Sequence, residues 1–268
     1  MAAQRVVQAK FANLWQTCIA PDYMFVHQDI YEELMSNFKK TILNFYTDSP
    51  QNSQEITRII SPTHTERLIS LLQNSQGNIL MGGKNFNIQE KYLEPTIIEN
   101  PDPNSDLMKE EIFGPILPVY KFNRIQEPIE FINQREKPLA LYYYGNNKHN
   151  LSQIENETSS GAFSTNECMY YLLNSHVPFG GVGASGLGYL HGLHGFNSCS
   201  HLKTVFYGQK YNGSLVNMRY PPLTKKNAEL INQTLKYGNF YIKQFPKKVA
   251  GIVSACVLIG YIRKIKNN

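Results

Sequence analysis

The sequence predicts an α/β fold in which a parallel or mixed β-sheet is flanked by helices. Short apolar segments alternate along the chain with longer segments whose apolar residues recur at helical spacing. Strands that alternate with helices in this way usually form a parallel sheet covered by the helices. The 268 residues, 42% of them hydrophobic, are enough for one large domain or two small ones.

Three helices are predicted in the first part of the chain. Residues 2–12 and 32–46 each carry apolar side chains at helical spacing. A third helix begins at Ser61, because a serine N-cap followed by a proline is a typical helix start. The apolar positions that define these helices are Val6, Val7 and Phe11; Leu34, Phe38, Ile42 and Phe45; and Leu68, Ile69 and Leu72.

The predicted strands follow the third helix. The first covers Asn78–Met81 and stops at two glycines. The others cover residues 92–98, 117–122, 139–144 and 201–207. A further helix, marked by Ile125, Ile129 and Ile132, lies between the third and fourth of these strands.

Composition excludes some classes of function. The net charge of +5, from 26 basic and 21 acidic residues, is too diffuse to indicate a nucleic-acid-binding protein. The four cysteines include no C-x-x-C pair, which indicates a reducing compartment and no disulfide framework. No apolar run follows a charged amino terminus, so no secretory signal is predicted.

A thiol close to the start of the chain is the first candidate for chemistry. Cys18 lies in the segment QTCIAPDY, which ends in a proline-containing turn. A cysteine considered alone is more often a small core residue. On a turn it is also a candidate nucleophile, since the thiolate is the reactive form.

Two further segments give this cysteine a context. The sequence EEIFGPI begins at Glu110, and PFGGVG begins at Pro178. In this order and spacing the three segments resemble the C-terminal half of a class 3, fatty-aldehyde type aldehyde dehydrogenase. The resemblance runs from about residue 6 to residue 222, which is most of the chain.

The resemblance implies a role for each matching residue. Cys18 corresponds to the nucleophile, which forms a thiohemiacetal with the aldehyde before hydride leaves to a nicotinamide and water hydrolyses the thioester. Glu111 corresponds to the carboxylate that holds the nicotinamide ribose, and Phe113 packs near the ring; without the resemblance, Glu111 would be interpreted as a solvated glutamate. Asn166 and Phe179 match the wall of the substrate entrance. The implied cofactor is NAD or NADP, with no metal, and the implied substrate is an aldehyde.

One position departs from the family pattern. The family has Asn-x-Gly-Gln-x-Cys, whereas residues 13–18 place Trp15 where the glycine stands. Glycine at such a place usually serves a positive φ angle or a close backbone approach. A left-handed Trp15 is expected to cost about 1–2 kcal/mol.

Two apparent motifs are not assigned a function. Residues 181–186 match G-x-G-x-x-G, but a dinucleotide fingerprint should follow a strand, open a helix and precede an acidic residue. In the family this loop shapes the substrate entrance. A cluster of histidine and cysteine residues invites a zinc interpretation, but its spacing matches no standard site. Its members are His191, His194, Cys199 and His201.

The resemblance divides the chain into four parts. Residues 1–195 are the expected catalytic domain, and residues 196–222 the expected oligomerisation arm. The strand at 201–207 would then pair with a partner subunit, although an ordinary edge strand remains the alternative. Residues 223–246 are interpreted as a connector, and residues 247–268 as a hydrophobic tail.

The tail contains an uncharged segment over residues 249–262. A helix of this length reaches about 21 Å, shorter than a hydrocarbon core of about 30 Å. It is either a buried or interfacial helix, or an anchor whose flanking lysines and Arg263 reach the headgroups. The anchor would hold the domain on the cytosolic face of a thin membrane such as the endoplasmic reticulum.

The family places its nicotinamide-binding domain, general base and oxyanion asparagine ahead of the cysteine. Only 17 residues precede Cys18 here, so the isolated chain is expected to be truncated and inactive. Three interpretations stay open: a relic or incomplete gene product, half of a two-chain enzyme, or a non-catalytic, membrane-tethered partner of a full-length paralogue. The expected assembly is a homodimer, or a heterodimer with that paralogue.

Overall fold

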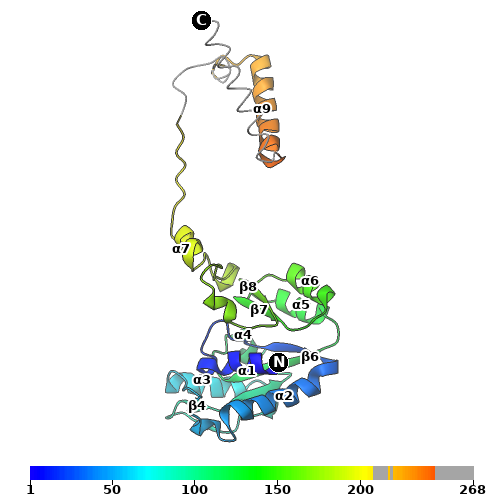
Figure 1. The fold of residues 1–268 in the computed structure, drawn as a ribbon, viewed down its shortest axis with the longest axis vertical. Helices are drawn as coiled ribbons and strands as arrows, with labels where there is room; N and C mark the ends of the chain where they lie inside the picture. Colours follow the sequence, from blue (N-terminus) through cyan, green and yellow to red (C-terminus); the bar gives the residue numbers. More distant parts are fainter. Residues whose placement is uncertain (208–216, 218–219, 245–268) are drawn as a thin grey trace. The chain divides into compact units, whose positions relative to one another are not determined.

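The computed structural model describes residues 1–207, 217 and 220–244. They belong to two compact units, Met1–His201 and a second unit that begins at Leu202 (Figure 1). The helices of the first unit are α1 (Ala2–Phe11), α2 (Gln28–Tyr46), α3 (Pro62–Gln73), α4 (Asp106–Lys109), α5 (Gln126–Asn133), α6 (Lys148–Glu157) and α7 (Gly192–Ser198), with short 3-10 turns η1 (Ala12–Trp15), η2 (Pro50–Asn52), η3 (Tyr170–Leu173) and η4 (Gly183–Ser185). The strands are β1 (Met24–His27), β2 (Asn78–Met81), β3 (Phe86–Asn87), β4 (Tyr92–Leu93), β5 (Thr96–Glu99), β6 (Ile116–Phe122), β7 (Ala140–Tyr143) and β8 (Ala162–Thr165).

The central sheet is mixed, which confirms the predicted α/β fold. Its strand order is β1-β6-β5-β2. Strands β1 and β5 both run parallel to β6, and β2 runs antiparallel to β5. Two smaller sheets pair β3 with β4 in antiparallel and β7 with β8 in parallel.

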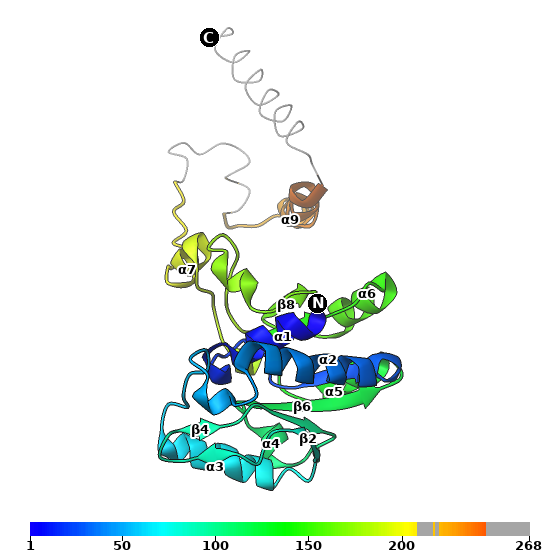
Figure 2. The same cartoon turned by 60° about the horizontal axis from the view of Figure 1, so that its bottom comes forward.

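Helices α1 and α2 pack against one another, and α2 covers β1 and β6 (Figure 2). Phe38 and Ile42 on α2 are fully buried, as their spacing predicts. Phe45 lies at the edge of that face and is partly exposed. The main core of the unit is formed by these two helices, the sheet and α3, whose Leu68 and Leu72 belong to the same buried cluster.

Two helix starts can be traced to their caps. Helix α2 begins at Gln28, four residues before the predicted segment, because the His27 side chain accepts a hydrogen bond from the Asp29 N–H (3.4 Å). Helix α3 begins where predicted, and the Ser61 hydroxyl accepts a hydrogen bond from the His64 N–H (3.1 Å).

The predicted strand over residues 92–98 is divided into β4 and β5. Pro95 lies between them, and a proline has no N–H to donate to a strand ladder. Gly82, in a left-handed conformation (φ 73°), packs its backbone against the Pro95 carbonyl, where a Cβ atom would clash. Both the missing N–H of Pro95 and its close contact with Gly82 therefore keep β4 and β5 separate.

A second, smaller core joins β7 to the helices beside it. Ile129 of α5, Leu141 of β7 and Ile154 of α6 are buried together. Figure 1 shows α5 and α6 next to β7 and β8. The isoleucine spacing predicted α5, whereas α6 and β8 were not predicted.

The end of the chain differs from the prediction. The strand expected over residues 201–207 does not form in this chain, since residues 202–207 have no sheet partner within the described ranges, and Leu202 and Phe206 are 89% and 87% exposed. In the second unit, helix α9 (Lys225–Gln244) occupies the segment interpreted as a connector. No helix of the described part is long and apolar enough to cross a membrane. The predicted tail helix at residues 249–262 lies outside the described residues.

Candidate active site

Cys18 lies in the turn that follows η1, and it is exposed. The Ala20 N–H donates a hydrogen bond to the Thr17 carbonyl (2.9 Å), which closes the turn around the thiol. The next residue, Ile19, is buried, and its carbonyl accepts a hydrogen bond from the Tyr142 hydroxyl (2.7 Å). The backbone beside the thiol is thus anchored while the sulfur faces solvent.

The backbone before this turn is left-handed. Asn13, Leu14 and Trp15 have φ angles of 55°, 47° and 68°. Trp15 therefore adopts the conformation expected of the glycine that it replaces. Its ring is 1% exposed, and its indole Nε1 has no hydrogen-bond partner among the described residues.

A lysine is buried beneath the turn. Lys10 of α1 is fully buried, and its Nζ donates a hydrogen bond to the Pro21 carbonyl (2.8 Å). The ammonium group also contacts the ring of Trp15. Burial lowers the pKa of Lys10 well below its usual value, and the charge of Asp22 opposes that shift.

Asp22 connects the cysteine turn to the second motif. Its Oδ1 accepts a hydrogen bond from the Ile112 N–H (3.2 Å), in the middle of the segment EEIFGPI. Burial raises the pKa of Asp22, while Lys10, the Ile112 N–H and Arg67 oppose that shift. The fold therefore brings together two of the three predicted motifs.

Helix α3 fixes the other side of this segment. Arg67 donates hydrogen bonds from its guanidinium to the carbonyls of Glu111 (2.6 Å) and Ile112 (3.0 Å). His64 Nε2 lies 2.9 Å from the Phe113 carbonyl. Phe113 itself has a φ angle of 52°, which is a left-handed conformation.

The carboxylate of Glu111 accepts no hydrogen bond from the described residues. Burial raises the pKa of Glu111, the charge of Asp22 raises it further, and Arg67 opposes both. A carboxylate of this kind can accept two hydrogen bonds from neighbouring hydroxyl groups. Glu111 is therefore a candidate ligand for the ribose diol of a nicotinamide cofactor.

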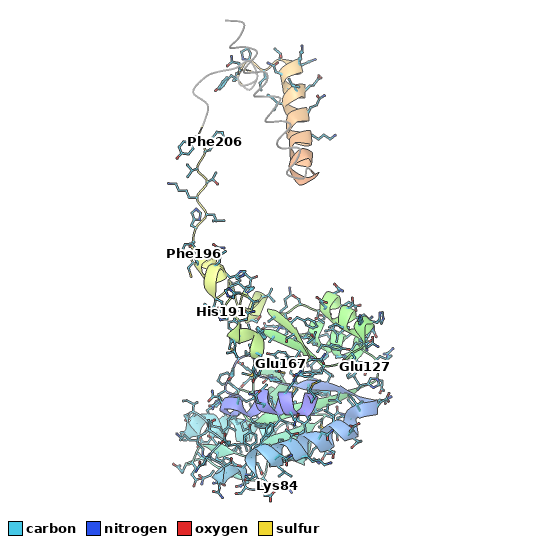
Figure 3. All side chains as sticks on the ribbon, viewed as in Figure 1. Lys84, Glu127, Glu167, His191, Phe196 and Phe206 are labelled. Carbon is cyan, nitrogen blue, oxygen red and sulfur yellow. The ribbon has the colours of Figure 1, made fainter. Side chains whose placement is uncertain are left out.

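Asn166 has a mainly structural set of contacts. Its side-chain amide accepts a hydrogen bond from the Gly145 N–H (3.0 Å) and donates one to the Gly145 carbonyl (3.1 Å). Its own carbonyl accepts a hydrogen bond from Arg5, which also pairs with Glu167 (3.3 Å; Figure 3 labels Glu167). Both polar ends of the Asn166 amide are therefore engaged with backbone.

Phe179 belongs to an aromatic group. Its ring stacks on His191 at 5.8 Å between centroids and lies 6.3 Å from Tyr171 (Figure 3 labels His191). Burial raises the pKa of Tyr171, and the charges of Cys18 and Cys168 contribute to the shift. Tyr171 thus lies near the candidate nucleophile and next to the predicted wall residue.

Sequence reasoning missed Lys10, Asp22, Arg67 and Tyr171 as parts of this site. The apolar spacing that predicts the first helix gives no role to Lys10, and Asp22 is only one member of the segment QTCIAPDY. No local signal identifies them, because their partners are distant in sequence. Burial of a charged residue becomes visible only in the fold.

The unassigned motifs have no dinucleotide or metal geometry. The loop at residues 181–186 contains only η4, a turn of three residues, and no α-helix opens there. Among the described residues, no group of three His, Cys, Asp or Glu side chains could hold a metal ion.

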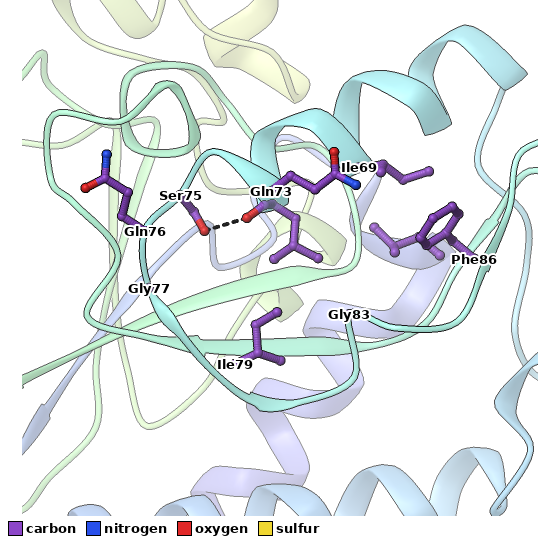
Figure 4. A pocket seen from close by; sticks show the side chains of 10 residues that line it. Ile69, Gln73, Ser75, Gln76, Gly77, Ile79, Gly83 and Phe86 are labelled. Carbon is purple, nitrogen blue, oxygen red and sulfur yellow. Dashed lines mark hydrogen bonds between the residues drawn. The ribbon is translucent and has the colours of Figure 1, made fainter.

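A pocket of about 200 Å³ lies at the end of α3, beside β2 (Figure 4). It is lined by Ile69, Leu72, Gln73, Ser75, Gln76, Gly77, Ile79, Gly83, Phe86 and Leu93. None of the predicted site residues lines it.

Comparison with known proteins agrees with this geometry. A family model described as "Aldehyde dehydrogenase family" matches residues 1–205. Aldehyde dehydrogenase family 3 member A2 of Mus musculus is 38% identical over 260 residues, which are 97% of this chain and 52% of that protein. The 4,4'-diaponeurosporen-aldehyde dehydrogenase of Staphylococcus aureus is 40% identical over 77% of this chain and 45% of its own length.

Solved structures show the same relation. The substrate-bound state of Staphylococcus aureus AldH has a TM-score of 0.78 and 37% identity, over 87% of this chain and 50% of that one. An NAD-dependent aldehyde dehydrogenase from Sinorhizobium meliloti has a TM-score of 0.70 and 25% identity, over 79% and 43% of the two chains. The chain spans about half the length of the curated relatives it matches. From its sequence match and its fold, the chain belongs to the aldehyde dehydrogenase family.

Proposed function

We propose that this chain supplies the nucleophilic part of an NAD(P)-dependent enzyme of the class 3, fatty-aldehyde type, which oxidises medium- and long-chain aldehydes to acids. The observation that supports this most directly is the hydrogen bond from the Ile112 N–H to Asp22. This hydrogen bond holds the turn that contains the exposed thiol of Cys18 against the segment that contains the carboxylate of Glu111. Such an arrangement is suited to a nucleophile beside a cofactor.

Each side chain has a defined task in this proposal. The Cys18 thiolate attacks the aldehyde carbonyl, and Glu111 accepts hydrogen bonds from the ribose hydroxyls. Tyr171 and Phe179 provide an aromatic wall for an apolar chain. A bound nicotinamide would supply the hydride acceptor.

Activity of the 268-residue chain is proposed to require the amino-terminal half that the relatives have and this chain does not span. By family resemblance, that half holds the general base and the oxyanion asparagine. A positioned general base contributes about 10²–10⁴-fold to a rate, and one oxyanion donor about 10²–10³-fold. That half is either joined to this chain covalently or supplied by a second chain; in the alternative, this chain is a non-catalytic partner of a full-length paralogue.

The test is an assay of NAD(P)H formation with a fatty aldehyde. The chain alone is expected to show no activity and no saturable NAD binding at micromolar concentration. Addition of the amino-terminal half of the mouse relative is expected to restore oxidation, and Cys18→Ser in the same mixture is the control. If the Cys18→Ser mixture is as active as the unaltered one, the assignment of the nucleophile is wrong.

We also propose that residues 247–268 anchor the protein to an internal membrane such as the endoplasmic reticulum, with the domain in the cytosol. The support is the uncharged segment at 249–262 and the basic residues on both sides of it.

A further inference from the structure

We propose that Lys10 and Asp22 together position the Cys18 turn against the Glu110–Phe113 segment, through the hydrogen bonds that their charged groups make to Pro21 and Ile112. Both are positioning residues, since neither is placed to touch a substrate. The proposal rests on the proposed function only where it regards Cys18 as the nucleophile and Glu111 as a cofactor-binding residue.

The first contact runs from α1 to the cysteine turn. Lys10 is 0% exposed, and its ammonium donates to the carbonyl of Pro21, three residues after Cys18 (2.8 Å). An ammonium group without water needs hydrogen-bond acceptors and a negative partner. Asp22 follows Pro21, and its charge raises the pKa of Lys10 against the effect of burial.

The second contact runs from the turn to the cofactor segment. The same Asp22 carboxylate accepts the Ile112 N–H (3.2 Å). The charge of Arg67 lowers the pKa of Asp22, and its guanidinium donates hydrogen bonds to the carbonyls of Glu111 and Ile112. Helix α1, the cysteine turn and the Glu110–Phe113 segment are thus connected through Lys10, Asp22 and Arg67.

Stability alone does not account for such a pair. Two apolar residues of similar volume are often at least as stabilising as a buried ion pair, because both charges lose their hydration. Two charged groups instead restrict the orientation of the segments that carry them, because each group is stable only when its hydrogen-bond acceptor or donor and the opposite charge are both close to it. The geometry therefore points to a positioning role, which can be separated from stability by experiment.

The experiment compares Asp22→Asn, Lys10→Met and the double variant K10M/D22N in the full chain. Three quantities are measured: the iodoacetamide labelling rate of Cys18 relative to that of exposed Cys199, the hydrogen exchange of residues 110–114, and the urea midpoint. The D22N substitution keeps an oxygen acceptor for the Ile112 N–H but leaves Lys10 without a counter-charge. Glu99→Gln is the matched control, because Glu99 pairs with Lys121 (2.9 Å) in the main sheet.

For D22N we expect at least a fivefold change in the relative Cys18 rate and faster exchange at 110–114, with neither change in E99Q. K10M/D22N is expected to recover the urea midpoint without recovering the labelling rate or the protection from exchange. If all three recover together, the pair has only a structural role. If D22N changes nothing, Lys10 and Asp22 do not act as charges, and the proposal fails.

Two features keep this test decisive. The neutral double variant can be compared directly with the parent protein if the single variants do not fold. No measurement needs an aldehyde or a nucleotide. An inactive enzyme would therefore contradict the proposed function and leave this inference standing.

Discussion

Trp15 combines two opposing contributions to stability at a single residue. Its left-handed backbone (φ 68°) is unfavourable by about 1–2 kcal/mol for a residue with a Cβ atom. Its buried ring packs edge-on against Phe11 at 5.6 Å, and loss of a buried Trp side chain costs about 3–5 kcal/mol. Packing is the larger contribution, which explains how the chain tolerates this residue.

Trp15→Gly should therefore destabilise the protein by about 1–4 kcal/mol in urea unfolding, despite the relaxed backbone. Asn13→Gly is the control for the backbone contribution, because Asn13 shares the left-handed conformation (φ 55°) without a large buried ring. Equal or greater stability of the Trp15→Gly variant would show that strain, not packing, dominates here.

Cys168 should behave differently from the exposed thiols. Its Sγ lies 3.1 Å from the Tyr144 hydroxyl, and burial raises its pKa to about 11. The folded protein then holds a proton that the unfolded chain releases near pH 9. Because the folded state binds more protons in this window, the free energy of unfolding should fall as the pH rises from 9 towards 11.

The check is a series of urea titrations at several pH values, with Cys168→Ala expected to reduce this slope. At pH 8, iodoacetamide should label Cys18 and Cys199 well before Cys168. Rapid labelling of Cys168 in the folded protein would contradict the buried environment.

At this scale the sequence indicated Cys18, Glu111 and Phe113, because they lie within recognisable motifs. Lys10 and Asp22 could not be identified as parts of the site, because the sequence alone does not show whether a charged residue is buried or exposed. The left-handed backbone at Trp15 could be predicted only from the family pattern, which has a glycine at this position.

Helix α3 matters beyond its own packing, since His64 and Arg67 hold the segment with Glu111 and Phe113. Its first turn depends on Ser61, whose hydroxyl accepts the His64 N–H (3.1 Å). Ser61→Ala should lower the free energy of unfolding by about 1 kcal/mol, as for other N-cap serines.

Ser70→Ala on the same helix is the control for Ser61→Ala, because Ser70 is an exposed residue in the helix interior. Urea unfolding of both variants, with hydrogen exchange at 110–114, tests the connection between cap and site. An equal effect of the two substitutions would show that the cap is not specific.

Elements with a cap or a strong apolar period were predicted well, as α1, α3 and β2 show. The predicted strand over residues 92–98 includes Pro95, which has no N–H to donate, and the structure has two strands there instead of one. Strands β1 and β8 are short, and each gains its ladder from a partner far along the chain, β6 and β7 respectively. Local sequence does not contain that pairing, which is why both were missed.

For the molecule as a whole, the family match ends at residue 205, close to the end of the first compact unit at His201. The fold of that unit could be predicted from motifs because they specify a known architecture. The expected strand at 201–207 has no neighbour among the described residues of this chain, and an arm that pairs with a second subunit stays a prediction.

The remaining whole-molecule prediction concerns residues 247–268 and the cellular location. A helix over the uncharged residues 249–262 would be about 21 Å long, so the flanking basic side chains must span the rest of a thin bilayer. A shortfall of this kind costs only fractions of a kcal/mol per Å, whereas one charge at the centre of the segment costs about 2.5–3.5 kcal/mol.

Deletion of residues 247–268 should therefore move the protein from the membrane pellet to the soluble fraction, and Leu258→Lys should do so in part. Lys236→Ala, a single change in α9 of the second unit, is the matched control and should leave the protein in the pellet. Recovery of the full-length protein in the soluble fraction after gentle lysis would mean that the segment packs against protein and does not anchor the chain.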